Sequence, residues 1–376
     1  MSTTRYAEVR STLRNTATNP GEHHDLAQGE RLTLTKPDDW HLHVRDGELL
    51  RVVVPDSARR FARAIIMPNL QPPITTTDLA RQYRERILAA VPGGISFQPL
   101  MTLFLNDKTT PSEIVRAKAS GFVHGVKWYP AGATTNAEHG VREITHSYAA
   151  LEAMQEQGLP LLLHAETTDP DIDIFDREEV FLDRQLTPVI RRFPGLRVVV
   201  EHLTTRNAVQ FVRDTSSQVG GTITAHHLLL NRNALFTGGL RPHHYCRPVL
   251  KREQHRLALI EAATSGHPRF FHGTDSAPHL RRDKESACGC AGIYTAHAAI
   301  ELFAEVFEQA DALDRLEQFA SFHGADFYGL PRNTERISLV KNPWQVATSL
   351  EVNDDSVIPF RAGESVAWRL ADVESK

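Results

Sequence analysis

Histidine, lysine and aspartate residues recur at the ends of short apolar segments in this sequence. The set consists of His41, His43, Lys127, His164, His202 and Asp275. Imidazole nitrogens and carboxylate oxygens are preferred ligands of zinc and related ions in proteins. His41 and His43 are two residues apart, so on a strand their side chains would share one face. If the segments converge, this set of residue types predicts a metal-binding pocket.

Each of these residues alone also has an ordinary structural explanation. The spacing of His41 and His43 by itself is a weak signal of a metal site. Lys127 could pack its aliphatic stem and pair its amine with a carboxylate, and Asp275 could cap the segment that follows it. Residues of these types that all stand at predicted strand ends are harder to explain separately, and their joint occurrence favours the metal pocket.

The elements that must position these residues follow from the alternation of apolar segments with amphipathic helical stretches. Eight strand candidates cover residues 40–44, 64–67, 96–103, 125–129, 160–164, 197–202, 221–226 and 269–273. Helical patterns lie between them, for example at residues 144–157, 177–192 and 253–264. Residues 110–113 form a helix N-cap with proline at the first helical position and a capping glutamate.

Strands that alternate with helices indicate βαβ units and a parallel sheet. Eight such units in roughly 250 residues fit an α/β fold of the (β/α)8 (TIM) barrel type better than an open doubly wound sheet. The sequence has no G-x-G-x-x-G or Walker motif to support the nucleotide-binding alternative. The carboxyl ends of barrel strands line the active site in such enzymes, so we expect the candidate ligands to meet at one mouth of the barrel.

The chain continues beyond the eighth predicted strand. It contains two further helical patterns and three short strand patterns that we expect to pack against the barrel, at residues 295–309, 311–322, 336–340, 349–352 and 365–369. We therefore predict one catalytic domain over residues 30–376 with C-terminal appendages. Residues 1–29 are polar, lack the apolar core of a secretory signal and contain acidic residues, so they are predicted to be a flexible N-terminal extension.

The composition narrows the class of protein. The chain has 376 residues, 41% hydrophobic and 23% charged, and 42 Lys and Arg against 46 Asp and Glu leave a net charge of −4. This balance excludes a disordered or collagen-like chain and argues against a nucleic-acid partner. No apolar run approaches the roughly 18–20 residues that span a bilayer, so no membrane association is expected. Three cysteines, an odd number in a long chain, do not suit a disulfide framework and favour a cytoplasmic setting.

Longer stretches around these residues resemble the dihydroorotase family of the amidohydrolase superfamily, and in particular its type II branch of bacteria and fungi. The resemblance is carried by residues 39–47, 67–69, 126–130, 163–166, 201–202 and 273–279, with further matches at residues 171–178, 231–233 and 288–292. It extends over nearly the whole chain outside the N-terminal extension. The fold it implies is the (β/α)8 barrel of the metal-dependent amidohydrolases.

The resemblance implies two zinc ions per subunit. The implied ligands are His41, His43 and Asp275 for one ion and His164 and His202 for the other. Lys127, carboxylated by CO₂, would bridge the two ions. A carbamate suits this role because it is an anionic, two-oxygen ligand, whereas an ammonium group has no lone pair.

The reaction implied is the reversible cyclisation of N-carbamoyl-L-aspartate to (S)-dihydroorotate plus water, in de novo pyrimidine (UMP) biosynthesis. In the hydrolytic direction a metal-bridging hydroxide would be the nucleophile. Asp275 would be the general acid and base, taking the hydroxide proton and passing it to the departing nitrogen. Members of this branch are commonly homodimers, so we expect a homodimer that acts on a small molecule.

The resemblance also implies a substrate-binding set. Its members are His43, Arg45, Asn69, His164, Arg247, His279 and Ala291. Arg45, Asn69 and His279 would bind the substrate carboxylate, and the two-pronged guanidinium suits that group. Arg247 and Ala291 would contact the pyrimidine ring, largely through the main chain, although the family usually has an apolar residue where Arg247 stands. Thr134 and Thr135 match a flexible loop that closes over substrate.

Two alternatives remain open at this point. Another cyclic amidase on the same scaffold, such as a hydantoinase or allantoinase, would keep the metal ligands and change the carboxylate-binding set. The presence of Arg45, Asn69 and His279 argues against it. A non-catalytic dihydroorotase-like subunit would be expected to have lost ligands, and here all the ligand positions are filled.

Overall fold

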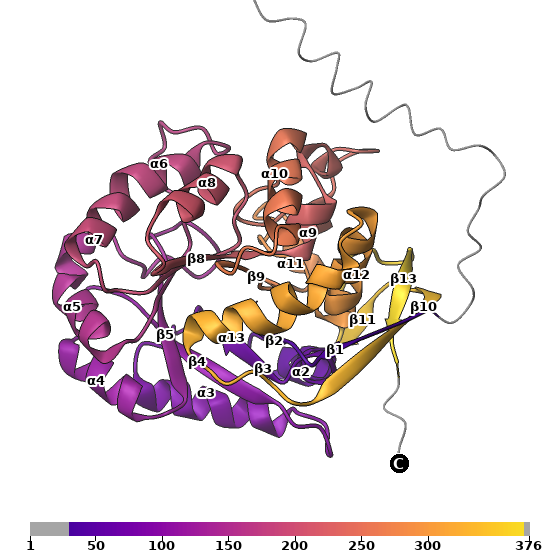
Figure 1. Cartoon of the computed structure of the whole chain (residues 1–376), viewed down its shortest axis with the longest axis horizontal. Helices are drawn as coiled ribbons and strands as arrows, with labels where there is room; N and C mark the ends of the chain where they lie inside the picture. Colours follow the sequence, from indigo (N-terminus) through magenta and orange to yellow (C-terminus); the bar gives the residue numbers. More distant parts are fainter. Residues whose placement is uncertain (1–29, 372–376) are drawn as a thin grey trace, which may run out of the picture.

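Eight parallel strands follow one another around the centre of the molecule in chain order (Figure 1). They are β2 (Asp38–Leu42), β3 (Arg63–Ile66), β4 (Gln98–Phe104), β5 (Val123–Trp128), β6 (Leu161–Leu163), β7 (Val198–Val200), β8 (Val219–Ile223) and β9 (Phe270–His272). This computed structural model describes residues 30–371, and the predicted extension at residues 1–29 lies outside that range. With helices on the outside, the sheet confirms the predicted (β/α)8 barrel.

The barrel closes between β2 and the segment that follows β9. Asp275 N donates to His41 O (2.9 Å) and His43 N donates to Ser276 O (3.1 Å). The carboxylate of Asp39 accepts hydrogen bonds from Thr274 N (2.9 Å) and Thr274 Oγ1 (2.6 Å). This closure brings the carboxyl end of the first strand directly beside that of the last, and with them the residues predicted to bind metal.

Glycine is required where these two segments meet. A Cβ atom on Gly273 would lie 2.8 Å from Cβ of His41, closer than real Cβ contacts allow. A larger residue would therefore push the last strand away from the first, and the ligands carried by the two would separate.

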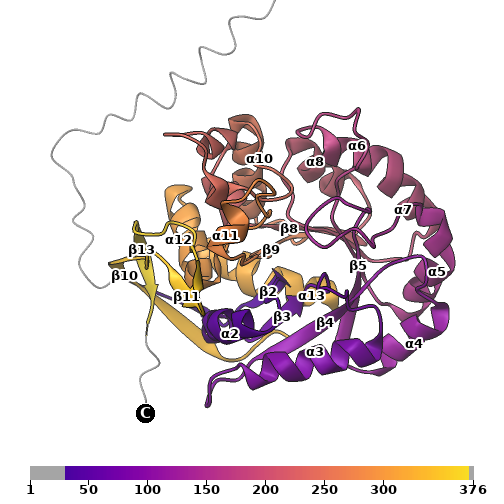
Figure 2. The same ribbon diagram turned by 180° about the vertical axis from the view of Figure 1, so that it is seen from behind.

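Most helices cover the outside of the strands, as Figures 1 and 2 show from opposite sides, and α13 lies across one end of the barrel. The helices are α2 (Glu48–Arg60), α3 (Thr77–Ala89), α4 (Pro111–Ala119), α5 (Tyr148–Gln157), α6 (Arg177–Phe181), α7 (Thr187–Arg192), α8 (Arg206–Asp214), α9 (Ala225–Leu229), α10 (Glu253–Thr264), α11 (Arg281–Lys284), α12 (Ala299–Gln309) and α13 (His323–Tyr328). The α4 start matches its sequence signal, since Thr110 Oγ1 accepts from Glu113 N (3.2 Å). The predicted 177–192 helix is α6 and α7 joined by a π-helical turn, η2 (Leu182–Leu186).

Two apolar layers result from the alternation of side chains along the strands. One layer lies between strands and helices. The other fills the inside of the barrel, where Trp40, Leu100 and Phe271 pack with other strand residues and with Tyr328 of α13. The rings of Trp40 and Tyr328 stack with centroids 4.6 Å apart. Arg197, just before β7, donates to the carbonyl of Phe327 (3.0 Å), so α13 closes the barrel at the amino ends of its strands.

The C-terminal appendages build two small antiparallel sheets. In the first, β10 (Arg336–Gln345) pairs with β1 (Arg31–Thr35) on one side and β13 (Ser365–Leu370) on the other. The second is the hairpin of β11 (Leu350–Val352) and β12 (Asp355–Val357). The three predicted C-terminal strands are present as β10, β11 and β13. Of these, β13 packs against α12 and β11 against α2 (Figure 1).

Two predicted elements differ from the structure. The predicted strand 221–226 ends at Ile223, because Thr224 caps α9 by accepting a hydrogen bond from His227 N (3.2 Å). The helical pattern predicted at residues 311–322 continues through α13 as far as Tyr328. No helix within residues 30–371 is both long and apolar enough to cross a membrane.

Candidate metal centre

Three of the predicted ligands meet where the barrel closes. His41 Nε2 lies 3.1 Å from His43 Nε2, and each of these nitrogens lies 3.3 Å from Asp275 Oδ1. In a tetrahedral zinc site with ligand bonds of about 2.0–2.1 Å, neighbouring ligand atoms are about 3.3–3.4 Å apart. The three atoms therefore already have the separation that a single zinc ion requires, and this part of the site fits the metal.

The other two histidines come from two adjacent strands farther around the barrel, β6 and β7. His164 follows β6 and His202 lies just beyond β7, and their ring centroids are 4.9 Å apart. Ligand atoms of His41, His202 and Asp275 lie within 4.8 Å of one another, which joins the two groups into one cluster. His202 Nδ1 is buried, and no residue in the described part of the chain hydrogen-bonds to it. A buried ring nitrogen that has no hydrogen-bond partner and lies beside other candidate ligands fits a metal-binding role.

Burial keeps these imidazoles neutral. It holds the pKa of His41 below and that of His202 well below the ordinary value, and it lowers the pKa of His43 to about 3, with the Arg45 guanidinium adding to the effect. Burial likewise lowers the pKa of His164. Neutral imidazole has the free lone pair that a metal needs, so the electrostatics of the cavity suit metal binding.

Lys127 lies beneath this cluster on β5 and is fully buried. Its Nζ contacts the carboxylate of Glu201, whose other oxygen lies 3.2 Å from His41 Nδ1. Burial holds the pKa of the amine well below its usual range. The interior of the barrel thus presents an amine, and not a hydrated ammonium group, to the histidine cluster.

Sequence reasoning missed two carboxylates that hold the histidines. Glu201 lies next to His202 in the sequence and contacts both His41 and Lys127. Glu166 lies two residues after His164, and its Oε2 is 2.7 Å from His164 Nε2. Carboxylates that hold the second nitrogen of a ligating histidine fix its tautomer and ring orientation. Their positions close to His164 and His202 in the sequence could have indicated this role.

The backbone at the site is held in an unusual conformation. Arg45, His202 and Asp275 have φ of 55°, 45° and 43°, the left-handed region that residues other than glycine rarely adopt. Such strain is kept when surrounding contacts over-determine it, and it gathers at functional sites. Here it turns ligand and substrate-binding side chains into one cavity.

The predicted carboxylate-binding residues lie on one wall of that cavity. Arg45 Nη2 is 2.8 Å from His279 Nε2, and Arg45 Nε donates to Pro278 O (3.1 Å). His279 Nε2 also lies 3.0 Å from Ala291 O. The guanidinium of Arg45 therefore lies between the candidate metal ligand His43 and the segment that carries Ala291.

The predicted flexible loop forms the roof of the same cavity. Asn69 Nδ2 donates to Thr135 O (3.0 Å), and Arg247 Nη1 donates to Ala133 O (3.1 Å). Thr134 and Thr135 line the cavity. Tyr129, a residue that sequence reasoning did not select, lines it as well.

Lys284 holds two parts of the cavity wall together from behind. Its Nζ donates to Tyr245 O (2.7 Å), Cys290 O (2.8 Å) and Gly292 O (2.7 Å), and the residue is 3% exposed. These carbonyls flank the segments that carry Arg247 and Ala291. Lys284 is a further residue that sequence reasoning missed, because its acceptors are main-chain atoms.

In a second group of metal-ligand types, two of the three members are paired or protonated, whereas the buried ring of His226 has no hydrogen-bond partner within the described residues. His226, His227 and Cys246 place ligand atoms within 4.8 Å of one another. However, His227 Nδ1 pairs with Thr224 Oγ1 (2.7 Å) and His227 Nε2 with Pro248 O (3.0 Å). Burial raises the pKa of the Cys246 thiol to about 12, so the thiol stays protonated. We interpret this group as packing.

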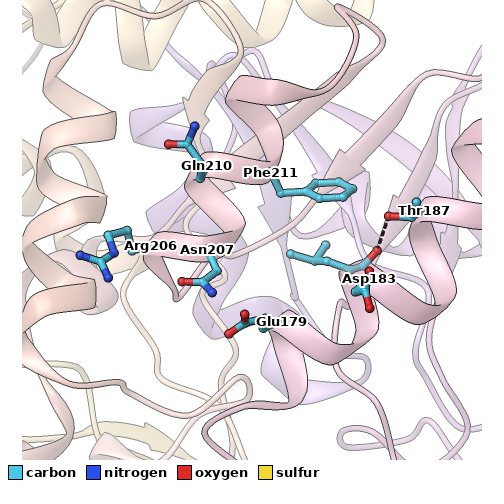
Figure 3. Close-up of a pocket in the computed structure, with 8 residues that line it drawn as sticks. Glu179, Asp183, Thr187, Arg206, Asn207, Gln210 and Phe211 are labelled. Atoms are coloured by element: carbon cyan, nitrogen blue, oxygen red, sulfur yellow. Dashed lines mark hydrogen bonds between the residues drawn. The ribbon is translucent and has the colours of Figure 1, made fainter.

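A separate hollow lies on the outer surface between the α6–α7 segment and α8 (Figure 3). Its lining side chains include Glu179, Asp183, Thr187, Arg206, Asn207, Gln210 and Phe211. They come from surface helices. Because active sites of (β/α)8 enzymes lie at the carboxyl ends of the strands, we place the chemistry at the histidine cluster and not in this hollow.

The comparisons with known proteins agree with this geometry. The profile of the Amidohydrolase family matches residues 38–366. The chain therefore belongs to the amidohydrolase family, and it has the (β/α)8 barrel fold of that family. The predicted membership in that superfamily is confirmed.

The comparisons are also more specific. The chain is 65% identical over 344 residues to a dihydroorotase of Nitrosomonas europaea. The aligned residues cover 91% of this chain and 99% of the relative. It is 35% identical to the solved dihydroorotase of Campylobacter jejuni (TM-score 0.84, 92% of this chain and 99% of that one). The dihydroorotase of Saccharomyces cerevisiae in complex with 5-fluoroorotic acid is equally similar (35%, TM-score 0.84, 91% and 98%). Within the family the chain is a cyclic amide hydrolase of the dihydroorotase group.

Proposed function

We propose that this protein is a zinc-dependent dihydroorotase that interconverts N-carbamoyl-L-aspartate and (S)-dihydroorotate in pyrimidine synthesis. The observation that carries the proposal is a compact metal-ligand set beside a carboxylate-binding group in one cavity. Ligand atoms of His41, His43 and Asp275 lie 3.1–3.3 Å apart. Arg45 lies next to them with His279. Relatives of up to 65% identity that are named dihydroorotases support the same activity.

The chain offers ligands for two ions. The residues that would hold them are His41, His43 and Asp275 for one zinc ion and His164 and His202 for the other. Lys127 would be the shared ligand after its amine nitrogen bonds to the carbon of CO₂ and releases a proton. The lowered pKa of this buried amine favours that reaction, since only the unprotonated form has a lone pair. Bound zinc would supply a water that ionises near neutral pH and an electrophile for the amide carbonyl.

The substrate is bound through its carboxylate. Arg45 presents a planar guanidinium that can donate two parallel hydrogen bonds to a carboxylate, which a lysine cannot do. Asn69 and His279 would complete this group, and Arg247 and Ala291 would contact the ring. Closure of the loop with Thr134 and Thr135 would exclude bulk water.

Asp275 moves the proton. In the hydrolytic direction its carboxylate takes a proton from the attacking water and returns it to the departing ring nitrogen. Hydrolysis creates a new carboxylate and releases a proton, so ring opening is favoured at higher pH and ring closure at lower pH.

The proposal is tested by metal analysis coupled to an assay of dihydroorotate hydrolysis. We expect two zinc ions per chain, loss of turnover when a chelator removes them, and recovery when zinc and bicarbonate are returned. Turnover that persists in metal-free protein would contradict the metal assignment. Absence of dihydroorotate turnover in fully loaded protein would contradict the function.

The alternatives are separated by substrates that lack the carboxylate. A hydantoinase or allantoinase would open hydantoin, dihydrouracil or allantoin, whereas we expect negligible turnover of these and ready turnover of dihydroorotate. Arg45→Lys should raise the KM for dihydroorotate by about tenfold or more with zinc content unchanged, because a point charge replaces the fork. Measurable dihydroorotate turnover also rules out the non-catalytic subunit.

The oligomeric state and the location of the protein stay predictions. We propose a homodimer in the cytoplasm. The three cysteines, Cys246, Cys288 and Cys290, are all unpaired, which suits a reducing compartment. Light scattering of the purified protein and fractionation of cells test the two statements.

A further inference from the structure

The side chain of Arg247 reaches the loop that covers the site. Its Nη1 donates to Ala133 O (3.1 Å). Its Nε donates to the hydroxyl oxygen of Tyr245 (3.0 Å), which orients the guanidinium. One side chain therefore spans from the segment that precedes Pro248 to the roof of the cavity.

Few other hydrogen bonds tie this loop to the cavity wall. Within the described chain, the backbone hydrogen bonds of residues 131–137 stay inside the segment 129–141. Three side-chain hydrogen bonds of the described residues tie the loop to the cavity wall. Asn69 Nδ2 donates to Thr135 O (3.0 Å), and Asn136 Nδ2 donates to Asn69 O (3.1 Å). The third is the bond from Arg247 to Ala133 O. Loss of the Arg247 contact would remove a large part of the attachment.

The two arginines of the cavity have different partners. Arg45 contacts His43, Pro278 and His279, all on the side of the metal ligands. The hydrogen bonds of Arg247 lead to the roof and to Tyr245. Arg45 is thus placed to recognise substrate, and Arg247 is placed to hold the loop.

We propose that Arg247 is a positioning residue that latches the loop 131–136 over the site. With an apolar residue at this position, closure would depend on Asn69 and on the substrate itself. With Arg247, part of the closing free energy is built into the chain and is present before substrate binds. The inference rests on the proposed function, in which Thr134 and Thr135 close over the substrate.

The kinetic consequence has a definite direction. Arg247→Leu removes the donor to Ala133 O and shifts the loop toward its open state. Loss of one hydrogen bond from a charged group in a half-buried place is worth about tenfold in an equilibrium. We therefore expect the KM for dihydroorotate to rise about tenfold, with kcat within about threefold of wild type and zinc content unchanged.

Hydrogen exchange of the substrate-free, zinc-loaded enzyme tests the latch directly. In Arg247→Leu the amides of residues 131–137 should exchange about tenfold faster, while the barrel strands exchange as in wild type. Arg241→Leu is the matched control, because Arg241 also donates to a main-chain carbonyl, Thr237 O (2.9 Å), but on an exposed loop away from the site. This control should leave the exchange of residues 131–137 and the KM unchanged.

A second variant keeps Arg247 and removes its orienting partner. In Tyr245→Phe, the loop amides should exchange about threefold faster than in wild type. In Arg247→Lys, a single ammonium group replaces the planar guanidinium, so exchange and KM should lie between those of wild type and Arg247→Leu. Loop exchange and KM equal to wild type in Arg247→Leu, or in Tyr245→Phe if the first variant does not fold, would overturn the latch. Failure of the proposed function would show separately, as absence of dihydroorotate turnover in wild type, and would leave the exchange result intact.

Discussion

The two ends of strand β2 carry similar polar side chains in opposite states of pairing. At the amino end, the carboxylate of Asp38 accepts Arg63 Nε (2.8 Å) and Asn333 Nδ2 (2.8 Å), and Arg63 Nη2 also donates to Pro331 O (2.9 Å). At the carboxyl end, the ring nitrogens of His41 and His43 crowd against the carboxylate of Asp275.

The difference separates structural from functional burial of charge. A buried ion is costly unless its hydrogen-bonding groups have partners. At the amino end, Arg63 donates to the carboxylate of Asp38, so each residue is the partner of the other. At the carboxyl end neutral imidazoles and a carboxylate offer lone pairs to one point, and within the described residues His202 Nδ1 has no partner. Acceptors that converge without a donor call for a cation. On this strand a matched ion pair thus marks the structural end, and converging acceptors mark the candidate metal site.

The largest expected effect is that of removing the lysine beneath the ligands. Lys127→Ala should lose most of the zinc, and activity should fall by more than about 10⁴-fold, because the metal and its chemistry leave together. Elemental analysis and the dihydroorotate assay check this. Lys36→Ala is the matched control, since Lys36 is also buried but lies at the amino end of the barrel, paired with Glu335 (3.1 Å).

Short carboxylic acids offer a second readout for this variant. They should restore part of the activity of Lys127→Ala by supplying the missing bridging carboxylate. Full zinc content and activity in the variant without added acid would refute the carbamate bridge.

Asp275→Asn should have the next largest effect. The amide cannot accept a proton, so turnover should fall by about 10³-fold while the fold and much of the zinc are kept. Asp38→Asn is the corresponding change at the amino end and should lower stability with little change in kcat. Near-wild-type turnover of Asp275→Asn would remove this residue from the role of general base.

A change at the paired end should affect stability and not chemistry. Arg63→Met leaves Asp38 buried without its main partner, which we expect to lower the free energy of unfolding by about 3 kcal/mol. Urea denaturation measures the loss, and kcat of the folded variant should stay within about twofold of wild type. If kcat fell by orders of magnitude while stability held, the contrast between the two ends would be wrong.

Lys284 provides the smallest and most discriminating effect. It is a buried residue at the carboxyl end of the barrel whose ammonium group donates to three main-chain carbonyls. Burial lowers its pKa from the ordinary value of 10.5 to about 8, with nearby Cys246 and Cys290 opposing the shift and Arg45 adding to it. Above about pH 8 the amine keeps two hydrogens for three carbonyls, so the wall that carries Ala291 should loosen and the KM should rise about threefold. Lys284→Met should have a raised KM that does not change over this range.

The lowered pKa of Lys284 should make the fold more stable as the pH rises, although substrate binding should weaken. Between pH 8 and 10.5 the unfolded chain binds the Lys284 proton and the folded chain does not. The free energy of unfolding of wild type relative to Lys284→Met should therefore increase with pH across this window. A parallel loss of stability and of substrate affinity above pH 8 would contradict this assignment.

The convergence of the candidate ligands could be predicted from the sequence because it depends on local rules. A strand places every second side chain on one face, and a barrel brings all its carboxyl ends together, so residues at those ends need no long-range information. His272 illustrates the same rule. Its place in the alternation predicts that it faces the helices, and its ring packs at 5.2 Å from Phe303 of α12.

The features that were missed depend on pairings between distant parts of the chain. The contact of Arg247 with Ala133 spans 114 residues. In the pairing of β1 with β10, Thr33 contacts Ser338, which lies 305 residues further along the chain. Neither partner carries a local signal of the other. The wrong end of the predicted strand 221–226 is different, because Thr224 is a good helix N-cap residue and was a readable stop signal.

The packed floor of the barrel has a consequence for how the enzyme is assembled. Trp40, Phe271 and Tyr328 fill the space below Lys127, so a molecule that reaches this lysine enters from the opposite, carboxyl side. Carbon dioxide, zinc and substrate would then share a single entrance. Maturation would have to precede the first turnover, and excess substrate would protect a loaded centre from chelators while slowing the loading of an empty one.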